Sequence, residues 1–529
     1  MGTFDYILMG IQAVFQGPAL FSILGISISV TLVMIFGGFL TGIAVGATPG
    51  LAGPVAMAIA LPILISVFGY TPDALLPVMG FLIGIMKGAT IGGAVPAILF
   101  NTPGTPDAFM TTLDGYPMTK RGKAKKALRV AHFASASGDT FSDIVLIICA
   151  PFLALMVEAY LDLPEKTALL ILSLSFIATV IGGSAAKGLI STGLGLLAAY
   201  IGTGEDFYPR LSMGQPALSQ GFPIATAVLG VLIIGAVLKE LEDLWRRKRD
   251  SGTLPEHRDE GDQRLRGADI RRLLPYIGRS ALIGTAIGAL PGIGSTLAAT
   301  LGYTVGKSRY ARKKRPDAPE FGQGAAEGIA ATEAANSSVS GANLIPVLSL
   351  GIPGNAAAVF LILAAESIGG FNPGPSVFRF TTDSVNPELV VAFGLFTAMM
   401  IANLLNWTVG GLFMRSMGVM IRIPKHVLLP SVLLLTLTAI YVQETRIEAI
   451  WFALGFGVLG YLMRAVAISP LPFVIAFILG GKLEENARQA FAATGGDPWF
   501  LFTNPGAAIL MALALAVIIL TSRKQKDPA

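Results

Sequence analysis

The sequence predicts an all-α polytopic membrane protein made of two inverted-topology repeats, with helices broken at Pro-Gly motifs and about 10–12 transmembrane spans. Three observations lead to this prediction. They are a strongly apolar composition, two short phrases that each occur twice, and the placement of the basic residues in a few loops.

The composition is that of a chain that lies mostly in lipid. Hydrophobic residues make up 53% and charged residues 13% of the 529 residues, and the mean hydropathy is +0.68. This leaves too little polar surface to cover a soluble body of that length. Residues 1–16 have no basic segment and no small-residue cleavage site, so we expect the first helix to be retained.

Several classes of function are disfavoured by the residue content. The net charge of +5 lies in loops and is explained by membrane topology, so we expect no nucleic-acid partner. The single cysteine, Cys149, excludes an intrachain disulfide, and His132, His257 and His426 have no acidic residue at ligand spacing. No nucleophile and base face each other, so we expect neither an enzyme nor a bound cofactor.

Two phrases recur in the same order in the two halves. Gly-Ala-Thr-Pro-Gly at residues 46–50 returns as Gly-Ala-Leu-Pro-Gly at 288–292, and the phrase at 95–104 returns at 345–354. Proline removes a backbone donor and glycine permits unusual conformations, so Pro-Gly within an apolar run ends one helix and starts another. Matched helix breaks in a duplicated membrane protein are typical of transporters.

The basic loops predict the topology and the division of the chain. Four loops, at residues 120–129, 246–272, 307–315 and 523–526, are dense in Lys and Arg, which places them and the C-terminus in the cytoplasm. The side of the N-terminus stays open. We expect a first repeat at 1–241, a charged cytoplasmic linker at 242–275, a second repeat at 276–481, and an extra span with a cytoplasmic tail at 482–529.

The apolar runs agree with these sides. Four spans lie between the first basic loop and the linker, near residues 131–157, 167–183, 188–203 and 221–241. Five follow the second pair of breaks, near 389–414, 427–443, 449–463, 467–481 and 504–521. The four spans between the first basic loop and the linker are an even number, so they return the chain to the cytoplasmic side, as the basic linker requires.

Equivalent loops of the two halves differ in charge. In the first half the loop between the breaks (66–73) is nearly uncharged and the loop after the second break is basic, whereas in the second half this order is reversed. Equivalent loops therefore face opposite sides of the membrane, which predicts an inverted repeat and alternating access.

The four breaks are expected to converge on one cavity near the membrane midplane, where helix N-termini favour an anion. The alternative is that Gly and Pro only allow close packing and kinks. Small polar residues flank the breaks and could also hold Na⁺, for which Asn336 and Ser337 are the candidates. The candidate substrate-binding residues are Thr48, Pro49, Gly50, Lys87, Asn101, Thr102, Pro103, Gly104, Thr105, Gly292, Gly294, Ser295, Thr296, Gly354 and Asn355.

Ionisable residues within apolar runs are further functional candidates, because burying them is costly. Lys87 either pairs with an acid or meets a substrate carboxylate, and both alternatives stay open. Asp139 and Asp143 lie further from the breaks and are interpreted as structural or interfacial, as is Lys187. The other ionisable candidates on the segments with breaks are Asp107, Glu327, Glu333 and Glu366.

The duplicated phrases, with Asp-Gly-Tyr-Pro at 114–117 and Glu-Ala-Ala-Asn at 333–336, resemble the large membrane (permease) subunit of the bacterial tripartite tricarboxylate transporter (TctA) family. The resemblance implies a secondary active importer of citrate or related tri- and dicarboxylates in the bacterial inner membrane, driven by a Na⁺ or H⁺ gradient. It also implies a small four-helix membrane subunit and a periplasmic solute-binding protein as partners. This chain departs from the family pattern at Lys87, where an aromatic residue is usual, and at Thr332, where proline is usual.

A passive organic-anion channel is the alternative function, because it would share the helix ends and the repeat but would need a continuous pore. The sequence leaves the substrate, the coupling ion and a homo-oligomeric state open.

Overall fold

The computed structural model describes residues 3–23, 26–48, 51–181, 184–203, 209–246, 262–291, 294–312, 319–380, 384–416 and 425–524. Within these residues the protein is helical, apart from two small antiparallel hairpins. One pairs β1 (Ala19–Ile23) with β2 (Ile26–Ser29), and the other pairs β3 (Gly202–Thr203) with β4 (Pro209–Arg210). The predicted all-α class is confirmed.

The first half of the chain forms helices that end or restart at both Pro-Gly phrases. Their bounds are α1 Thr3–Phe15, α2 Val30–Gly46, α3 Gly53–Phe68, α4 Pro72–Gly92, α5 Ala94–Phe100, η1 Pro106–Ala108, α6 Phe109–Lys120, α7 Ala124–Tyr160, α8 Leu163–Ile181, α9 Ala185–Tyr200, η2 Pro216–Leu218, α10 Ile224–Leu229, η3 Gly230–Ile234 and α11 Gly235–Arg246.

The second half repeats the interruptions and then adds further helices. Their bounds are α12 Gly267–Gly288, α13 Gly294–Arg312, α14 Ala326–Ala342, α15 Leu344–Leu350, α16 Ala356–Ile368, η4 Pro375–Phe378, α17 Pro387–Leu405, η5 Asn406–Gly410, α18 Gly411–Ser416, α19 Lys425–Glu444, α20 Ile447–Ala465, α21 Leu471–Ala493, α22 Phe500–Thr503 and α23 Pro505–Lys524.

Eight segments of the described chain are long and apolar enough to cross a membrane, and four more apolar helices are shorter. The prediction of about 10–12 spans is higher than eight because it also counts shorter apolar helices. Three of these, α2, α3 and α16, adjoin a break. The eight are Pro72–Phe100, Ala124–Tyr160, Leu163–Val180, Ile224–Arg246, Pro387–Met414, Val427–Glu444, Ile447–Ala465 and Pro505–Ser522.

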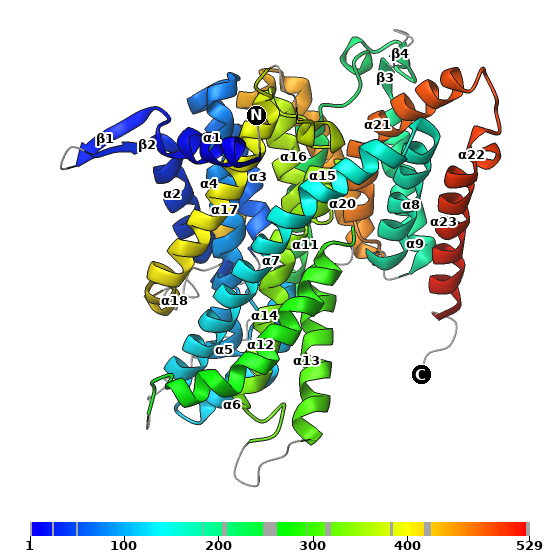
Figure 1. Cartoon of the computed structure of the whole chain (residues 1–529). Helices are drawn as coiled ribbons and strands as arrows, with labels where there is room; N and C mark the ends of the chain where they lie inside the picture. Colours follow the sequence, from blue (N-terminus) through cyan, green and yellow to red (C-terminus); the bar gives the residue numbers. More distant parts are fainter. Residues whose placement is uncertain are drawn as a thin grey trace.

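The centre of the molecule is built around the long helix α7. Its 37 residues extend over about 55 Å, well beyond the ~30 Å of bilayer hydrocarbon. It packs along α14, which also packs on α12 (Figure 1). The predicted basic loop at 120–129 is mostly helical, because α6 continues to Lys120 and α7 begins at Ala124.

The chain around the predicted linker packs against the start of α7. Lys126 Nζ lies 2.9 Å from Asp269 Oδ2 in the first turn of α12. Arg129 donates a hydrogen bond of 2.6 Å to the Gln263 carbonyl. Residues 262–275 are therefore not a free tether. Of the rest of the predicted linker, residues 242–246 form the end of α11 and residues 247–261 lie outside the described residues.

The second break has the same local geometry in both halves. The seven-residue helices α5 and α15 lie 250 positions apart and end at left-handed residues, Asn101 (φ 54°) and Gly351 (φ 71°). In each, a backbone N–H beyond the end donates to a proline carbonyl: Thr102 to Pro96 at 3.2 Å, and Ile352 to Pro346 at 3.2 Å.

The two halves also share a close helix contact. A Cβ added at Gly42 on α2 would lie 2.4 Å from the Ile85 carbonyl oxygen on α4. One added at Gly284 on α12 would lie 2.2 Å from the Ala335 carbonyl oxygen on α14. Helix backbones can approach this closely only at glycine. The pair α2 and α4 in the first half therefore packs in the same manner as the pair α12 and α14 in the second half.

Candidate functional site

The candidate site is a cavity of about 630 Å³ between the residues that follow the breaks of both halves. Three helices point their N-terminal residues at it. Gly53 and Pro54 begin α3, Gly294 begins α13, and Asn355 and Ala356 begin α16. Each terminus carries unpaired backbone N–H groups and a partial positive charge, worth roughly 0.3–1 kcal/mol towards an anion.

Six of the predicted site residues line this cavity. They come from the second break of the first half, from α14, and from both breaks of the second half. They are Thr105, Gly294, Ser295, Thr296, Asn336 and Asn355. The structure thus brings together residues that are up to 250 positions apart in the sequence.

Two of these residues make informative hydrogen bonds. Thr296 Oγ1 donates to Asp107 Oδ1 at 2.6 Å, which links the second half to the first across the cavity. Asn355 Oδ1 accepts from the Ala358 N–H at 2.9 Å and so caps α16. Asp107 is the only ionisable residue that lines the cavity within the described part of the chain.

The predicted cation ligands lie on α14. Asn336 lines the cavity, and its Nδ2 has no hydrogen-bond partner among the described residues. Ser337 is fully buried, and its Oγ has no partner there either. Among the residues that the structure describes, no group of three or more His, Cys, Asp or Glu side chains could hold a metal ion.

The other predicted residues of the breaks lie outside this cavity. Thr48 is buried and its Oγ1 donates to the Ala44 carbonyl at 2.9 Å. Asn101 and Thr102 are exposed, and Pro103 is half-buried. Gly104 and Gly354 are buried at close contacts with Gly46 and Asn343. Pro49, Gly50 and Gly292 lie outside the described residues.

Lys87 is fully buried and bonds two acids. Its Nζ lies 2.8 Å from Asp143 Oδ1 and 3.1 Å from Asp139 Oδ1. The same Nζ donates to Ser340 Oγ at 3.2 Å, and Asn403 Nδ2 donates to Asp143 Oδ2 at 2.7 Å. Of the two alternatives from the sequence, pairing with an acid is the one present here.

Ser340 and Asn403 were not predicted from the sequence, because an uncharged side chain on a distant helix carries no sign that it bonds to Lys87 or to its partner acids. Ser340 also lines the cavity, so its side chain lies between the cavity and Lys87. Of the remaining ionisable candidates, Glu333 is buried and accepts hydrogen bonds from Thr111 and from Ser135.

Asp114, in the Asp-Gly-Tyr-Pro phrase, organises the chain before α14. Its Oδ1 accepts backbone N–H bonds from Gly322, Gly324 and Ala325 at 2.8–2.9 Å. Burial raises the pKa of this carboxyl above its usual range, although these N–H bonds act in the opposite direction. Asp114 therefore has a structural role at the start of α14.

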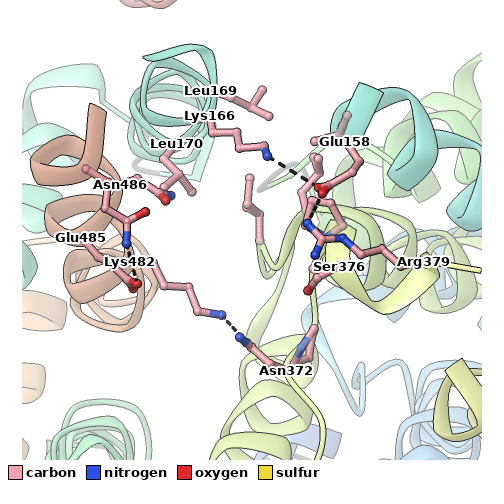
Figure 2. A pocket seen from close by; sticks show the side chains of 17 residues that line it. Glu158, Lys166, Leu169, Leu170, Asn372, Ser376, Arg379, Lys482, Glu485 and Asn486 are labelled. Atoms are coloured by element: carbon pink, nitrogen blue, oxygen red, sulfur yellow. Dashed lines mark hydrogen bonds and ion pairs between the residues drawn. The ribbon is translucent and has the colours of Figure 1, made fainter. Parts of the chain in front are cut away.

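A second cavity, of about 520 Å³, lies beside the second break of the second half and is lined in part by Leu350 and Ile352. Figure 2 shows Glu158 between Lys166 and Arg379, with which it forms ion pairs, and Lys482 turned towards Asn372. Its basic side chains are engaged by acidic or amide groups. The sequence did not predict this cavity, since its charged residues come from three distant parts of the chain.

Comparison with known proteins agrees with this architecture. Residues 32–475 match the tripartite tricarboxylate transporter TctA family. An uncharacterized 52.8 kDa protein in the TAR-I ttuC' 3'region of Agrobacterium vitis is 32% identical over 503 residues, which are 93% of each chain. An uncharacterized protein in the TAR-II ttuC' 3'region of the same organism is 34% identical over 241 residues, 45% of this chain and 93% of that one. No solved structure matches the chain.

The fold and the central cavity define an integral membrane protein of the transporter class, with broken helices that meet at one site. The chain belongs to the TctA family and is a membrane component of a tripartite tricarboxylate transporter. The sequence-based identification is confirmed, as is the prediction that the chain is not an enzyme, because the family is one of transporters.

Proposed function

We propose that the chain is the large membrane subunit of a secondary active importer for citrate or related tri- and dicarboxylates, and that the central cavity binds the substrate. A periplasmic solute-binding protein delivers the carboxylate, and a small four-helix membrane subunit completes the membrane unit. A Na⁺ or H⁺ gradient drives uptake by alternating access. The protein lies in the bacterial inner membrane with its basic segments and C-terminus in the cytoplasm.

The observation that carries this proposal is the convergence of three helix N-termini on one cavity. α3 comes from the first half, whereas α13 and α16 come from the second. Their N–H groups, with the hydroxyl and amide groups of Thr105, Ser295 and Asn336, could bind a carboxylate. No Lys or Arg among the described residues lines the cavity, so the binding would rest on these neutral donors.

The proposed inverted repeat is supported by the matched breaks and helix contacts of the two halves. In Figure 1, α4 lies above α5, whereas the equivalent α14 lies below α15. Such an arrangement would place the site between the two halves and allow it to open to either side in turn.

Asn336 and Ser337 remain the candidates for a Na⁺ site. Asp107 places a carboxylate on the cavity wall beside Asn336, and the buried Ser337 Oγ next to Asn336 in the sequence has no hydrogen-bond partner among the described residues. Both are oxygen ligands of the kind that a hard cation needs. A cation bound there would also offset the negative charge of Asp107 next to an anionic substrate.

The test is uptake of radiolabelled citrate into proteoliposomes that contain this chain, its small subunit and the cognate binding protein. The importer requires accumulation above the external concentration, dependent on the binding protein and on an inward Na⁺ or H⁺ gradient. Equilibration without a gradient would instead establish a passive organic-anion channel. Absence of uptake by folded protein would exclude citrate, and other dicarboxylates and tricarboxylates would be tested next.

A further inference from the structure

We propose that the buried cluster of Lys87, Asp139, Asp143 and Ser340 is a proton-binding site, and that the proton on Asp139 is the coupling ion of transport. The coupling role rests on the function proposed above, whereas the proton site itself does not. The cluster joins three helices: α4 through Lys87, α7 through both aspartates and α14 through Ser340. Asn403 on α17 donates a hydrogen bond to it at Asp143.

The charges of this cluster do not balance. Lys87 carries one positive charge, and the two carboxylates carry two negative charges when both are ionised. All three side chains are 0% exposed. A net charge in such a place is strongly disfavoured, and a buried group then takes up a proton instead. One proton makes the cluster neutral.

Hydrogen bonding assigns the proton to Asp139. Both oxygens of Asp143 accept hydrogen bonds, Oδ1 from Lys87 and Oδ2 from Asn403. Asp139 Oδ1 accepts from Lys87 and from Ser340, but Asp139 Oδ2 is buried without a partner in the described part of the chain. A negative charge on Oδ2 is the least stabilised in the cluster, so the O–H bond of the neutral acid forms there.

A proton fits this site better than a metal cation. The Lys87 ammonium has three donors, and it is within hydrogen-bond distance of Asp139, Asp143 and Ser340. It therefore takes the central position that Na⁺ would need between the two carboxylates. A proton needs only one oxygen atom and no coordination shell.

Other ionisable groups lie elsewhere on the helices that pack around the cluster. His132 and Glu333 come seven residues, about 10 Å, before Asp139 and Ser340 on their helices. α2, α3 and α15 contain no ionisable side chain. Asp107 on η1, which packs on α14, lines the central cavity together with Ser340. The remaining described ones are Asp5 and Tyr6 on α1, Asp73 on α4, Asp114, Tyr116 and Lys120 on α6, Lys125, Lys126, Arg129, Cys149, Glu158 and Tyr160 on α7, Asp269, Arg271, Arg272, Tyr276 and Arg279 on α12, Tyr303, Lys307, Arg309, Tyr310 and Arg312 on α13, Glu327 on α14, Glu366 on α16 and Glu388 on α17.

Ser340 gives the cluster a route to the substrate. It bonds to Lys87 and Asp139, and it lines the central cavity beside Asn336. The cluster also connects α4 of the first half to α14 of the second. Loss of the proton leaves a net negative charge beside the bound anion, so the substrate-loaded halves would rearrange only when Asp139 is neutral. The empty protein, which holds no anion next to the cluster, would return without the proton. The proton is taken from water on the side of substrate entry and returned to water on the other side.

The proton site is tested directly by infrared difference spectroscopy of the purified protein in lipid vesicles, between acidic and alkaline buffer. The expected result is a protonated-carboxyl C=O band that Asp139→Asn removes. Asp73→Asn, an exposed change on α4, and Glu333→Gln should both retain that band. Persistence of every protonated-carboxyl band in Asp139→Asn would overturn the proposal, whatever the transported substrate is.

The coupling role is tested with radiolabelled citrate in proteoliposomes. Wild-type protein should accumulate citrate on an inward proton gradient. Asp139→Asn should lose this accumulation but still exchange internal for external citrate, because it keeps a neutral Lys87–Asp143 pair, and Asp139→Glu should restore accumulation. Proton-driven or Na⁺-driven accumulation by Asp139→Asn at the wild-type level would refute coupling through Asp139. If wild-type protein neither accumulates nor exchanges citrate, the substrate proposal fails, and the infrared result alone decides on the proton site.

Discussion

The substitution Asn355→Asp separates anion binding from helix capping. Asn355 begins α16, and its Oδ1 accepts the Ala358 N–H at 2.9 Å. Asp is as good an N-cap as Asn, so the fold should be retained. The change places a new negative charge on the wall of the cavity in which we propose that the carboxylate binds.

The expected effect follows from the size of the cavity. An anion at the centre of a sphere of about 630 Å³ lies roughly 5 Å from the wall, where two like charges repel by about 3 kcal/mol at an effective dielectric constant of ~20. Since each ~1.4 kcal/mol corresponds to a tenfold change in affinity, the citrate concentration for half-maximal uptake should rise about a hundredfold.

The assay is the concentration dependence of citrate uptake in proteoliposomes at equal amounts of folded protein. Asn504→Asp is the matched control, because Asn504 Oδ1 also accepts a backbone N–H at a helix start, that of Ala507, and does not line the cavity. An unchanged half-maximal concentration in Asn355→Asp would show that the substrate does not bind beside α16.

Three stability changes should be measurable by thermal unfolding in detergent. Thr296→Val removes the hydrogen bond to Asp107 and should cost about 1 kcal/mol, which Thr296→Ser should restore. Gly284→Ala should cost about 1–3 kcal/mol by overpacking α12 against α14, whereas Gly278→Ala, which meets open space, should cost little. Asp114→Ala leaves three N–H groups without an acceptor and should cost about 3 kcal/mol or more, with Asp114→Asn closer to wild type. Equal stabilities within any of these pairs would contradict the packing or bonding described here.

Much of the architecture could be predicted from the sequence, because the signals are local. Proline and glycine within apolar runs determine where helices end, so the breaks at residues 101–104 and 351–354 were predicted at the positions where the structure has them. The lengths of the helices beside the breaks could not be predicted, since α3 and α16 are too short to be recognised as membrane spans from hydropathy and length.

The candidate site was predictable only in part. Thr105, Ser295 and Asn355 directly follow breaks, and proximity to a break is a property of the sequence. The direction in which each side chain points cannot be deduced from the sequence. Asn101 and Thr102 were therefore also predicted as site residues, but they are exposed. The partners of Lys87 lie 52 and 56 positions away on a different helix, and only the packing of α4 on α7 brings them together.

Thiol modification can show directly where the substrate binds. The chain has one cysteine, Cys149, so a Cys149→Ala background allows single cysteines to be introduced. Ser295→Cys places a thiol in the central cavity, and Ser376→Cys places one in the second cavity of Figure 2. The account predicts that saturating citrate slows modification at position 295 at least severalfold and leaves position 376 unaffected. Protection at position 376 alone would contradict substrate binding at the central cavity.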